Sequence, residues 1–85
     1  MSGLARVIVT LKAVVNDPQG LTVEHGLRSL GFDEIGQVRV GKYIEMRLDA
    51  ADEVSARARV EEMCTKLLAN HVIEDFRFDL ELSPA

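Results

Sequence analysis

Apolar residues alternate with other residues along three stretches of the chain, and this pattern predicts three extended segments. The stretches are residues 4–15, 35–49 and 72–82. In the middle stretch five apolar residues share one parity, and Lys42 alone interrupts the set. These five residues are Val38, Val40, Ile44, Met46 and Leu48. The shared parity predicts that one face of this segment is buried.

Two other stretches follow the period of a helix. Residues 21–30 predict a first helix, with Thr22 as its N-cap and Gly31 just beyond its end. The turn at residues 16–20 comes directly before it, because Asn, Asp, Pro and Gly favour turns. Residues 53–69 predict a second, longer helix. Its apolar stripe consists of Ala56, Val60, Met63, Cys64, Leu67 and Leu68.

The order of elements is strand, helix, long or paired strand, helix, strand. This order predicts one α+β domain over residues 1–85, a two-layer sandwich with both helices on one face of a mostly antiparallel sheet. The arrangement is ferredoxin-like in style. Two conformations are open at Gly41: one long strand bent at the glycine, or two strands joined by a three-residue connection.

The size of the chain predicts self-association. An 85-residue domain buries a small core, and such domains often gain stability from disulfides, metals or oligomerisation. One cysteine excludes an internal disulfide, and two histidines make a metal cluster improbable. We therefore expect a homodimer or a higher homo-oligomer.

Composition and charge exclude several classes of partner. The net charge is −4 and the ten cations are scattered, so binding to nucleic acid is not expected. No apolar run approaches the ~20 residues that span a bilayer, and the first residues lack the features of a signal peptide. We expect a cytoplasmic protein that does not associate with membranes.

No combination of residues predicts catalysis. Cys64 falls within the apolar stripe of a helix, where a thiol packs as a small hydrophobe. His25 and His71 lie in different elements, without a second ligand at metal spacing. The chain has neither G-x-G-x-x-G nor a Walker sequence. We expect no catalytic, cofactor-binding or metal-binding residue.

Three polar segments are candidates for a partner interface. Arg39, Lys42 and Tyr43 surround a glycine within an otherwise apolar strand pattern, and Tyr and Arg are enriched at protein interfaces. The turn before the first helix could alternatively cradle an anion, although a plain structural turn is favoured. The acidic pair before the last strand could meet a cation of a partner. The candidate interface residues are Asp17, Gln19, Gly20, Arg39, Gly41, Lys42, Tyr43, Glu74 and Asp75.

A series of short motifs occurs in a fixed order along nearly the whole chain. They are Leu11-Lys12, Asp17-Pro18-Gln19-Gly20, Leu30-Gly31-Phe32, Val38-Arg39-Val40-Gly41-Lys42-Tyr43, Met63-Cys64, Leu67-Leu68-Ala69-Asn70 and Val72-Ile73-Glu74-Asp75-Phe76. The ordered set resembles PurS, the small subunit of phosphoribosylformylglycinamidine synthase. His71 is a departure, since many members of that family have proline before the last motif.

The resemblance implies a role in de novo purine (IMP) biosynthesis. It implies a non-catalytic structural subunit that bridges a large synthetase subunit (PurL) and a glutamine amidotransferase subunit (PurQ). The complex would convert formylglycinamide ribonucleotide, glutamine and ATP into formylglycinamidine ribonucleotide, glutamate, ADP and phosphate, with this subunit supporting the transfer of ammonia. ATP and magnesium would be used by the synthetase subunit, so no cofactor is expected here.

A different class of function is the alternative. Small ferredoxin-like modules often bind amino acids or nucleotides as regulatory sensors. Gly20, Gly31 and Gly41 could line such a site at a dimer interface. Strong thermal stabilisation of the isolated protein by one small ligand would favour this alternative.

Overall fold

A computed structural model describes residues 1–13 and 15–83, so position 14 of the first predicted strand and residues 84–85 lie outside the described part. Its sheet is antiparallel, with the strands in the order β2-β1-β3. The strands are β1 (Ser2–Leu11), β2 (Gly41–Asp49) and β3 (Glu74–Ser83). The central strand β1 places Val7 between Ile44 of β2 and Phe78 of β3, so the apolar parity of all three strands falls on one face.

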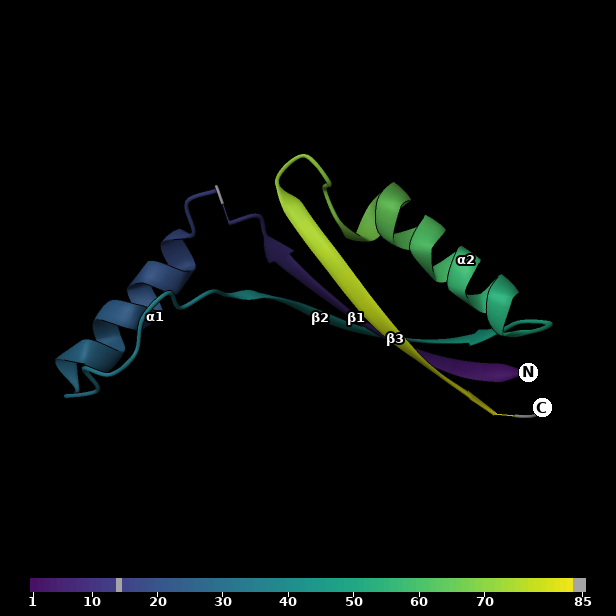
Figure 1. The fold of residues 1–85 in the computed structure, drawn as a ribbon, viewed down its shortest axis with the longest axis horizontal. Helices are drawn as coiled ribbons and strands as arrows, with labels where there is room; N and C mark the ends of the chain where they lie inside the picture. The colour runs from purple at the N-terminus through teal and green to yellow at the C-terminus, as the bar shows by residue number, and fades with distance from the viewer. Residues whose placement is uncertain (14, 84–85) are drawn as a thin grey trace.

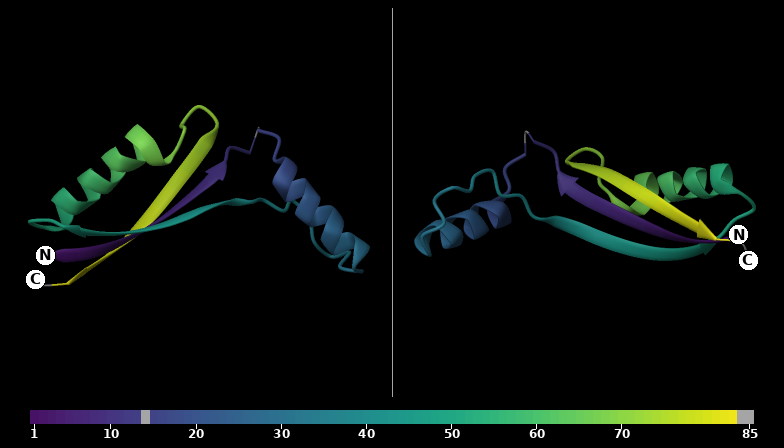
Figure 2. Two further views of the ribbon diagram at one scale, coloured as in Figure 1. Left: turned by 180° about the vertical axis from the view of Figure 1, so that it is seen from behind. Right: turned by 60° about the horizontal axis from the view of Figure 1, so that its bottom comes forward.

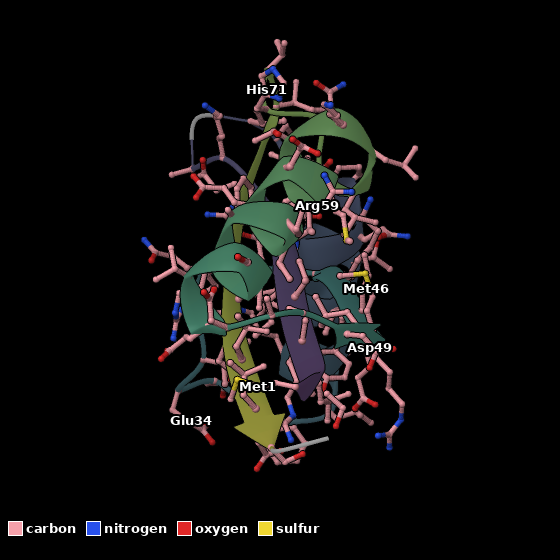
Figure 3. The ribbon with its side chains drawn as sticks, turned by 90° about the vertical axis from the view of Figure 1, so that its right-hand side faces the viewer. Met1, Glu34, Met46, Asp49, Arg59 and His71 are labelled. Atoms are coloured by element: carbon pink, nitrogen blue, oxygen red, sulfur yellow. The ribbon has the colours of Figure 1, made fainter. Side chains whose placement is uncertain are left out.

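The helix α2 (Glu53–Met63) covers this apolar face, as the end-on view in Figure 3 shows. Asp52 caps it by accepting a hydrogen bond from the Ser55 N–H at 2.7 Å. The helix continues as a π-helical turn (Cys64–Leu68), which closes when the Ala69 N–H donates to the Cys64 carbonyl at 3.0 Å. The buried apolar residues are Ala5, Val7, Val9, Ala56, Val60, Cys64 and Ala69.

The helix α1 (Pro18–Ser29) projects beyond the end of the sheet (Figures 1 and 2). The molecule measures 50 × 26 × 14 Å, and its radius of gyration is 16.5 Å. A compact chain of this length would have a radius of about 12 Å. We call residues 15–40, which comprise α1 and the extended return to β2, the arm.

The predicted α+β class, with an antiparallel sheet and two helices, is confirmed. The expected position of the first helix is corrected: only α2 lies on the sheet. The physical reason is the path at Gly41, where residues 38–40 lead directly into β2 without turning back. No hairpin forms there, so the chain takes the extended alternative and carries α1 away from the body.

Element boundaries differ from the expected ones at the middle strand and around the first turn. β2 begins at Gly41 instead of residue 35, so residues 35–40 of the predicted extended segment do not pair within the sheet. β1 ends at Leu11 instead of residue 15, and α1 begins at Pro18 instead of residue 21. Asp17 is the N-cap, and Thr22 lies inside the helix with its hydroxyl bonded to the Pro18 carbonyl at 2.9 Å. Proline at the first helical position explains the earlier start, because its fixed φ suits the helix and its missing N–H is not needed there.

Candidate functional site

The candidate interface residues separate into two groups in the structure. One group makes contacts with distant parts of the chain that explain its presence, and the side chains of the other are exposed without such distant contacts among the described residues. The first group is Asp17, Gly20, Gly41, Lys42, Glu74 and Asp75, and the second is Gln19, Arg39 and Tyr43. The structure does not gather all of them into one site, since the arm and the body hold different members.

Asp17 ties the start of α1 to the extended return of the arm. Its Oδ1 accepts from the Gly20 N–H at 2.9 Å, and its Oδ2 accepts from the Val40 N–H at 3.0 Å. These hydrogen bonds, that of Val40 first, lower the pKa of the Asp17 carboxyl. Because Asp17 already occupies the Gly20 amide, the structural interpretation of this turn is favoured over an anion site.

Gly20 allows the close approach of helix and strand within the arm. It is buried, and a Cβ at this position would overlap the Val38 carbonyl oxygen. The adjacent Val38 N–H donates to Glu24 Oε1 at 3.4 Å. Arg28 forms an ion pair with Glu24 and donates to backbone carbonyls of the loop that follows the helix. The arm is therefore one connected unit, because side chains of α1 bind the segment that follows the helix at several points along its length.

Lys42 and Glu74 anchor the end of the second helical segment to the sheet. Lys42 Nζ donates to the Leu68 carbonyl at 3.4 Å and lies 3.7 Å from a Glu74 oxygen. The Glu74 side chain is only 17% exposed, and its Oε1 accepts from the Asn70 N–H at 2.7 Å. A cation beside a helical C-terminal carbonyl is electrostatically favourable. Lys42, which interrupts the apolar parity, thus has a structural role.

The remaining candidates in the body also show internal contacts. Asp75 lies 3.9 Å from Lys12 as an exposed ion pair, which contributes little to stability. A Cβ at Gly41 would overlap the Val9 carbonyl oxygen, so the glycine lets β2 begin close against β1. Tyr43 is 56% exposed, and its hydroxyl donates to Glu45 at 2.8 Å. That hydrogen bond raises the pKa of the Tyr43 hydroxyl.

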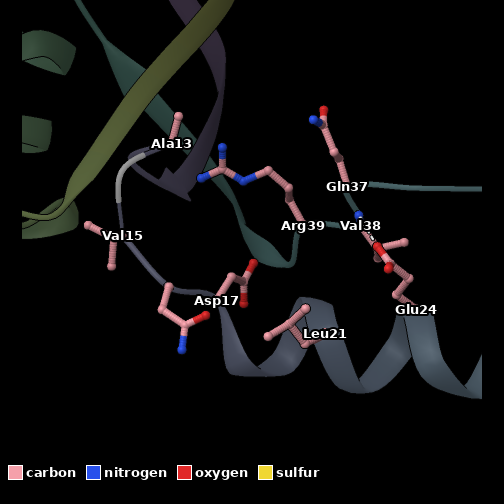
Figure 4. A pocket seen from close by; sticks show the side chains of 9 residues that line it. Ala13, Val15, Asp17, Leu21, Glu24, Gln37, Val38 and Arg39 are labelled. Carbon is pink, nitrogen blue, oxygen red and sulfur yellow. Dashed lines mark hydrogen bonds between the residues drawn. The ribbon is translucent and has the colours of Figure 1, made fainter.

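Arg39 stands over a hollow of the arm (Figure 4). The hollow has a volume of about 490 Å³ and opens broadly to solvent. Arg39 forms no ion pair with any residue that the structure describes. The other lining residues are Ala13, Val15, Asn16, Asp17, Leu21, Glu24, Gln37 and Val38. This mixture of charged and apolar groups suits contact with a protein better than it suits a small apolar ligand.

Sequence reasoning missed the exposed apolar residues of the arm. Leu30 is 76% exposed and Phe32 is 47% exposed, and Leu21 and Val23 are also open to solvent. The helical spacing of Val23 and Leu30 indicates an apolar helix face, and a helix lying on the sheet, as expected from the sequence, would have buried it. Exposed apolar side chains on a projecting element are typical of an interaction surface, although the body also exposes Val54, Leu67 and Val72.

The structure adds little that would support chemistry in this chain. Burial raises the pKa of the Cys64 thiol. Within residues 1–13 and 15–83, no three His, Cys, Asp or Glu side chains gather as they would to hold a metal ion. In the same residues, no helix is long and apolar enough to cross a membrane.

Comparison with known proteins gives consistent matches over almost the whole chain. A family model described as "PurS: Phosphoribosylformylglycinamidine (FGAM) synthase" matches residues 4–82. Phosphoribosylformylglycinamidine synthase subunit PurS of Synechocystis is 49% identical over 75 residues, which are 88% of this chain and 75% of that protein. The same subunit of Bacillus subtilis is 47% identical over 76 residues, which are 89% of each chain.

Solved structures agree with the sequence relatives. Bacillus subtilis PurS superposes with a TM-score of 0.83 at 45% identity, covering 94% of this chain and 99% of that one. A chain in the structure of PurLQS from Thermotoga maritima superposes with a TM-score of 0.84 at 29% identity. It covers 95% of this chain and 100% of that chain. The projecting arm is therefore compatible with experimentally determined folds.

Proposed function

The chain belongs to the PurS family, and we propose on this basis that it is the non-catalytic small subunit of FGAM synthase in purine biosynthesis. The observation that carries the proposal is the match to PurS over residues 4–82, together with the likeness to a chain of the PurLQS structure. The sensor alternative has no comparable support. The protein acts in the enzyme as a subunit and works together with PurL and PurQ.

The subunit bridges the synthetase and the glutaminase and supports the transfer of ammonia between them. Ammonia must cross between subunits without escaping to solvent, so the fit of the interfaces matters more than any single side chain here. In this scheme ATP and magnesium belong to the synthetase, this subunit holds no cofactor, and the complex is cytoplasmic. The elongated shape and the exposed apolar arm support a bridging role.

Gln19, Arg39 and Tyr43 are the interface candidates that the body and the arm leave available. Asp17, Gly20, Gly41, Lys42, Glu74 and Asp75 support the same interface indirectly, by fixing the arm and the strands that present it. The small core favours a homo-oligomer, and exposed residues such as Leu30 and Phe32 give it an apolar contact surface.

The test is reconstitution of FGAM formation from purified synthetase and glutaminase subunits, with and without this protein. Glutamine-dependent turnover should require it, whereas turnover with ammonia supplied directly should not. Equal glutamine-dependent turnover in its absence would refute the bridging role. Loss of both activities would instead indicate a direct effect on the synthetase.

A further inference from the structure

The last strand, β3, leaves its outer edge open. β3 lies at one side of the sheet, so β1 is its only neighbouring strand among residues 1–13 and 15–83. The edge is long and regular, because the register with β1 runs without interruption from Glu74 to Ser83. Proline, lysine, bulges and inward-pointing charges commonly keep such an edge from pairing with another chain. None of these occurs between Phe76 and Leu82, where the charged side chains all lie on the face away from α2.

The free backbone groups of this edge belong to its apolar residues. The Lys12 N–H donates to the Ile73 carbonyl at 2.8 Å, which makes these two residues a hydrogen-bonded pair of the β1–β3 ladder. Such pairs recur at every second position of an antiparallel ladder, so the odd-numbered residues of β3 bond to β1. Glu74 agrees with this phase, because its N–H turns to the Asn70 carbonyl at 2.7 Å. The residues whose N–H and C=O groups face outward are therefore Phe76, Phe78, Leu80 and Leu82.

The side chains beside this edge have capacity for further contacts on both faces of the sheet. On the inner face, Phe76 and Phe78 pack against the core but are only half-buried, since the fully buried residues of α2 lie over the central strand. On the outer face, the Asp79 and Glu81 side chains are 71% and 69% exposed, although Arg6 contacts both. Arg77 forms no ion pair with any residue that the structure describes.

We propose that β3 accepts an extended segment of a different protein as an additional, antiparallel strand of the sheet. Hydrogen bonds to the outward backbone groups supply the affinity of such a contact, and alternate side chains supply its specificity. Opposite charges across a strand pair are stabilising, and apolar residues pair with apolar ones. The complementary pattern, starting opposite Glu81 and ending opposite Asp75, is basic, apolar, basic, apolar, acidic, apolar, basic. This contact goes beyond the proposed function and does not depend on it.

A second copy of β3 fits this edge poorly. Self-pairing across a two-fold axis at Phe78 sets Arg77 opposite Asp79, but it also sets Asp75 opposite Glu81. Moving the axis to Arg77 or to Asp79 brings Asp79 opposite Asp75 or opposite itself. Like charges directly opposite destabilise a strand pair. The occupant is therefore a segment with a charge pattern of its own.

Amide hydrogen exchange of the full chain, followed by NMR, tests whether the edge is free. The amides of Phe78 and Leu80 should exchange rapidly, because they face outward. The amides of Arg77 and Asp79 should exchange only when the ladder with β1 opens. Equal protection of all four amides would overturn the proposal, since it would mean that another strand already covers the edge.

A synthetic peptide with blocked ends, Lys-Val-Lys-Val-Glu-Val-Lys, is the probe for the occupant. It should shift the NMR signals of Phe76, Phe78 and Leu80 and slow the exchange of their amides, while the signals of β2 stay unchanged. Methylation of the three valine amides removes the donors that face β3 and should abolish binding. Methylation of the lysine amides, which face away, is the matched control and should preserve it. Failure of the unmethylated peptide to bind at β3 would overturn the proposal.

A charge swap at Arg77 separates the register from general attraction between a basic peptide and an acidic protein. Wild-type protein should prefer the original peptide to one whose glutamate is replaced by lysine, by roughly threefold to tenfold. Arg77→Glu should reverse this preference. The Arg77 side chain is exposed and lies on the outer face, so the variant should keep the wild-type fold. The same preference in both proteins would overturn the proposal.

Discussion

Two glycines of the same helix should respond to alanine in opposite ways. Gly20 is buried where α1 meets the extended return of the arm, and a Cβ there would overlap the Val38 carbonyl oxygen. A Cβ at Gly26 would meet nothing within 4 Å. Alanine is favoured over glycine within a helix by up to about 1 kcal/mol, and this gain applies to both positions. The difference between the two variants therefore isolates the steric conflict.

The expected difference in unfolding free energy is about 1–3 kcal/mol, the usual cost of inserting a methyl group into a filled site. Gly26→Ala should be more stable than the wild type by about 0.5–1 kcal/mol. Gly20→Ala should be less stable than Gly26→Ala by this whole difference in unfolding free energy. For a chain of this size, each kcal/mol corresponds to a change in Tm of roughly 4–8 °C.

Urea unfolding followed by circular dichroism, at one fixed protein concentration, is the suitable assay because association also contributes to stability. A Gly20→Ala midpoint that equals that of Gly26→Ala would refute the reasoning. It would mean that helix and extended segment separate freely, and that the arm is not held together by the contacts of Asp17 and Glu24.

Four further predictions follow from single residues. Val60→Ala should lower the free energy of unfolding by about 1.5–3 kcal/mol, measured by urea unfolding, because Val60 is fully buried on the face of α2 that packs against the sheet. Cys64 should react with a thiol reagent only as fast as the protein unfolds, and rapid labelling of the native protein would contradict its burial. The lowered pKa of Asp17 contributes stability above its ordinary value of 3.8, and that contribution is lost as pH falls through the lower folded value. Asp17→Asn should therefore be less stable than the wild type at neutral pH. Below pH 3.8 its urea midpoint should change less with pH than the midpoint of the wild type does. Arg39→Ala should weaken assembly with the larger subunits while its circular dichroism spectrum stays unchanged, and normal glutamine-dependent turnover would contradict this.

The parity of apolar residues predicted the sheet well, because alternation depends only on which face is buried. Val7, Ile44 and Phe78 lie side by side as that rule requires. The second helix was predicted to within a residue at its end, although its last turn is π-helical. The sheet face and the second helix both depend on the local spacing of apolar residues, and this spacing can be identified in a single sequence.

The position of the first helix could not be obtained in the same way. Its apolar residues have the spacing of a core-facing stripe, and the periodicity does not say which molecule supplies the core. Lys42 shows a second limit: its charge looked like a surface signal, but its partners Leu68 and Glu74 are brought to it only by the fold. The position of the first helix and the role of Lys42 both depend on contacts between residues far apart in the chain, which sequence spacing does not specify.

The central position of β1 has a consequence for how the protein folds. One neighbour, β2, lies in the middle of the chain and the other, β3, near its end, so the pair formed by Ser2 and Ser83 joins residues 81 positions apart. Such long-range pairing slows folding, because loop entropy is lost before the contacts form. During synthesis β1 can pair with β2 after residue 49 has emerged, but its other edge stays unpaired until β3 follows. The folding rate should therefore depend more on chain closure than on helix formation.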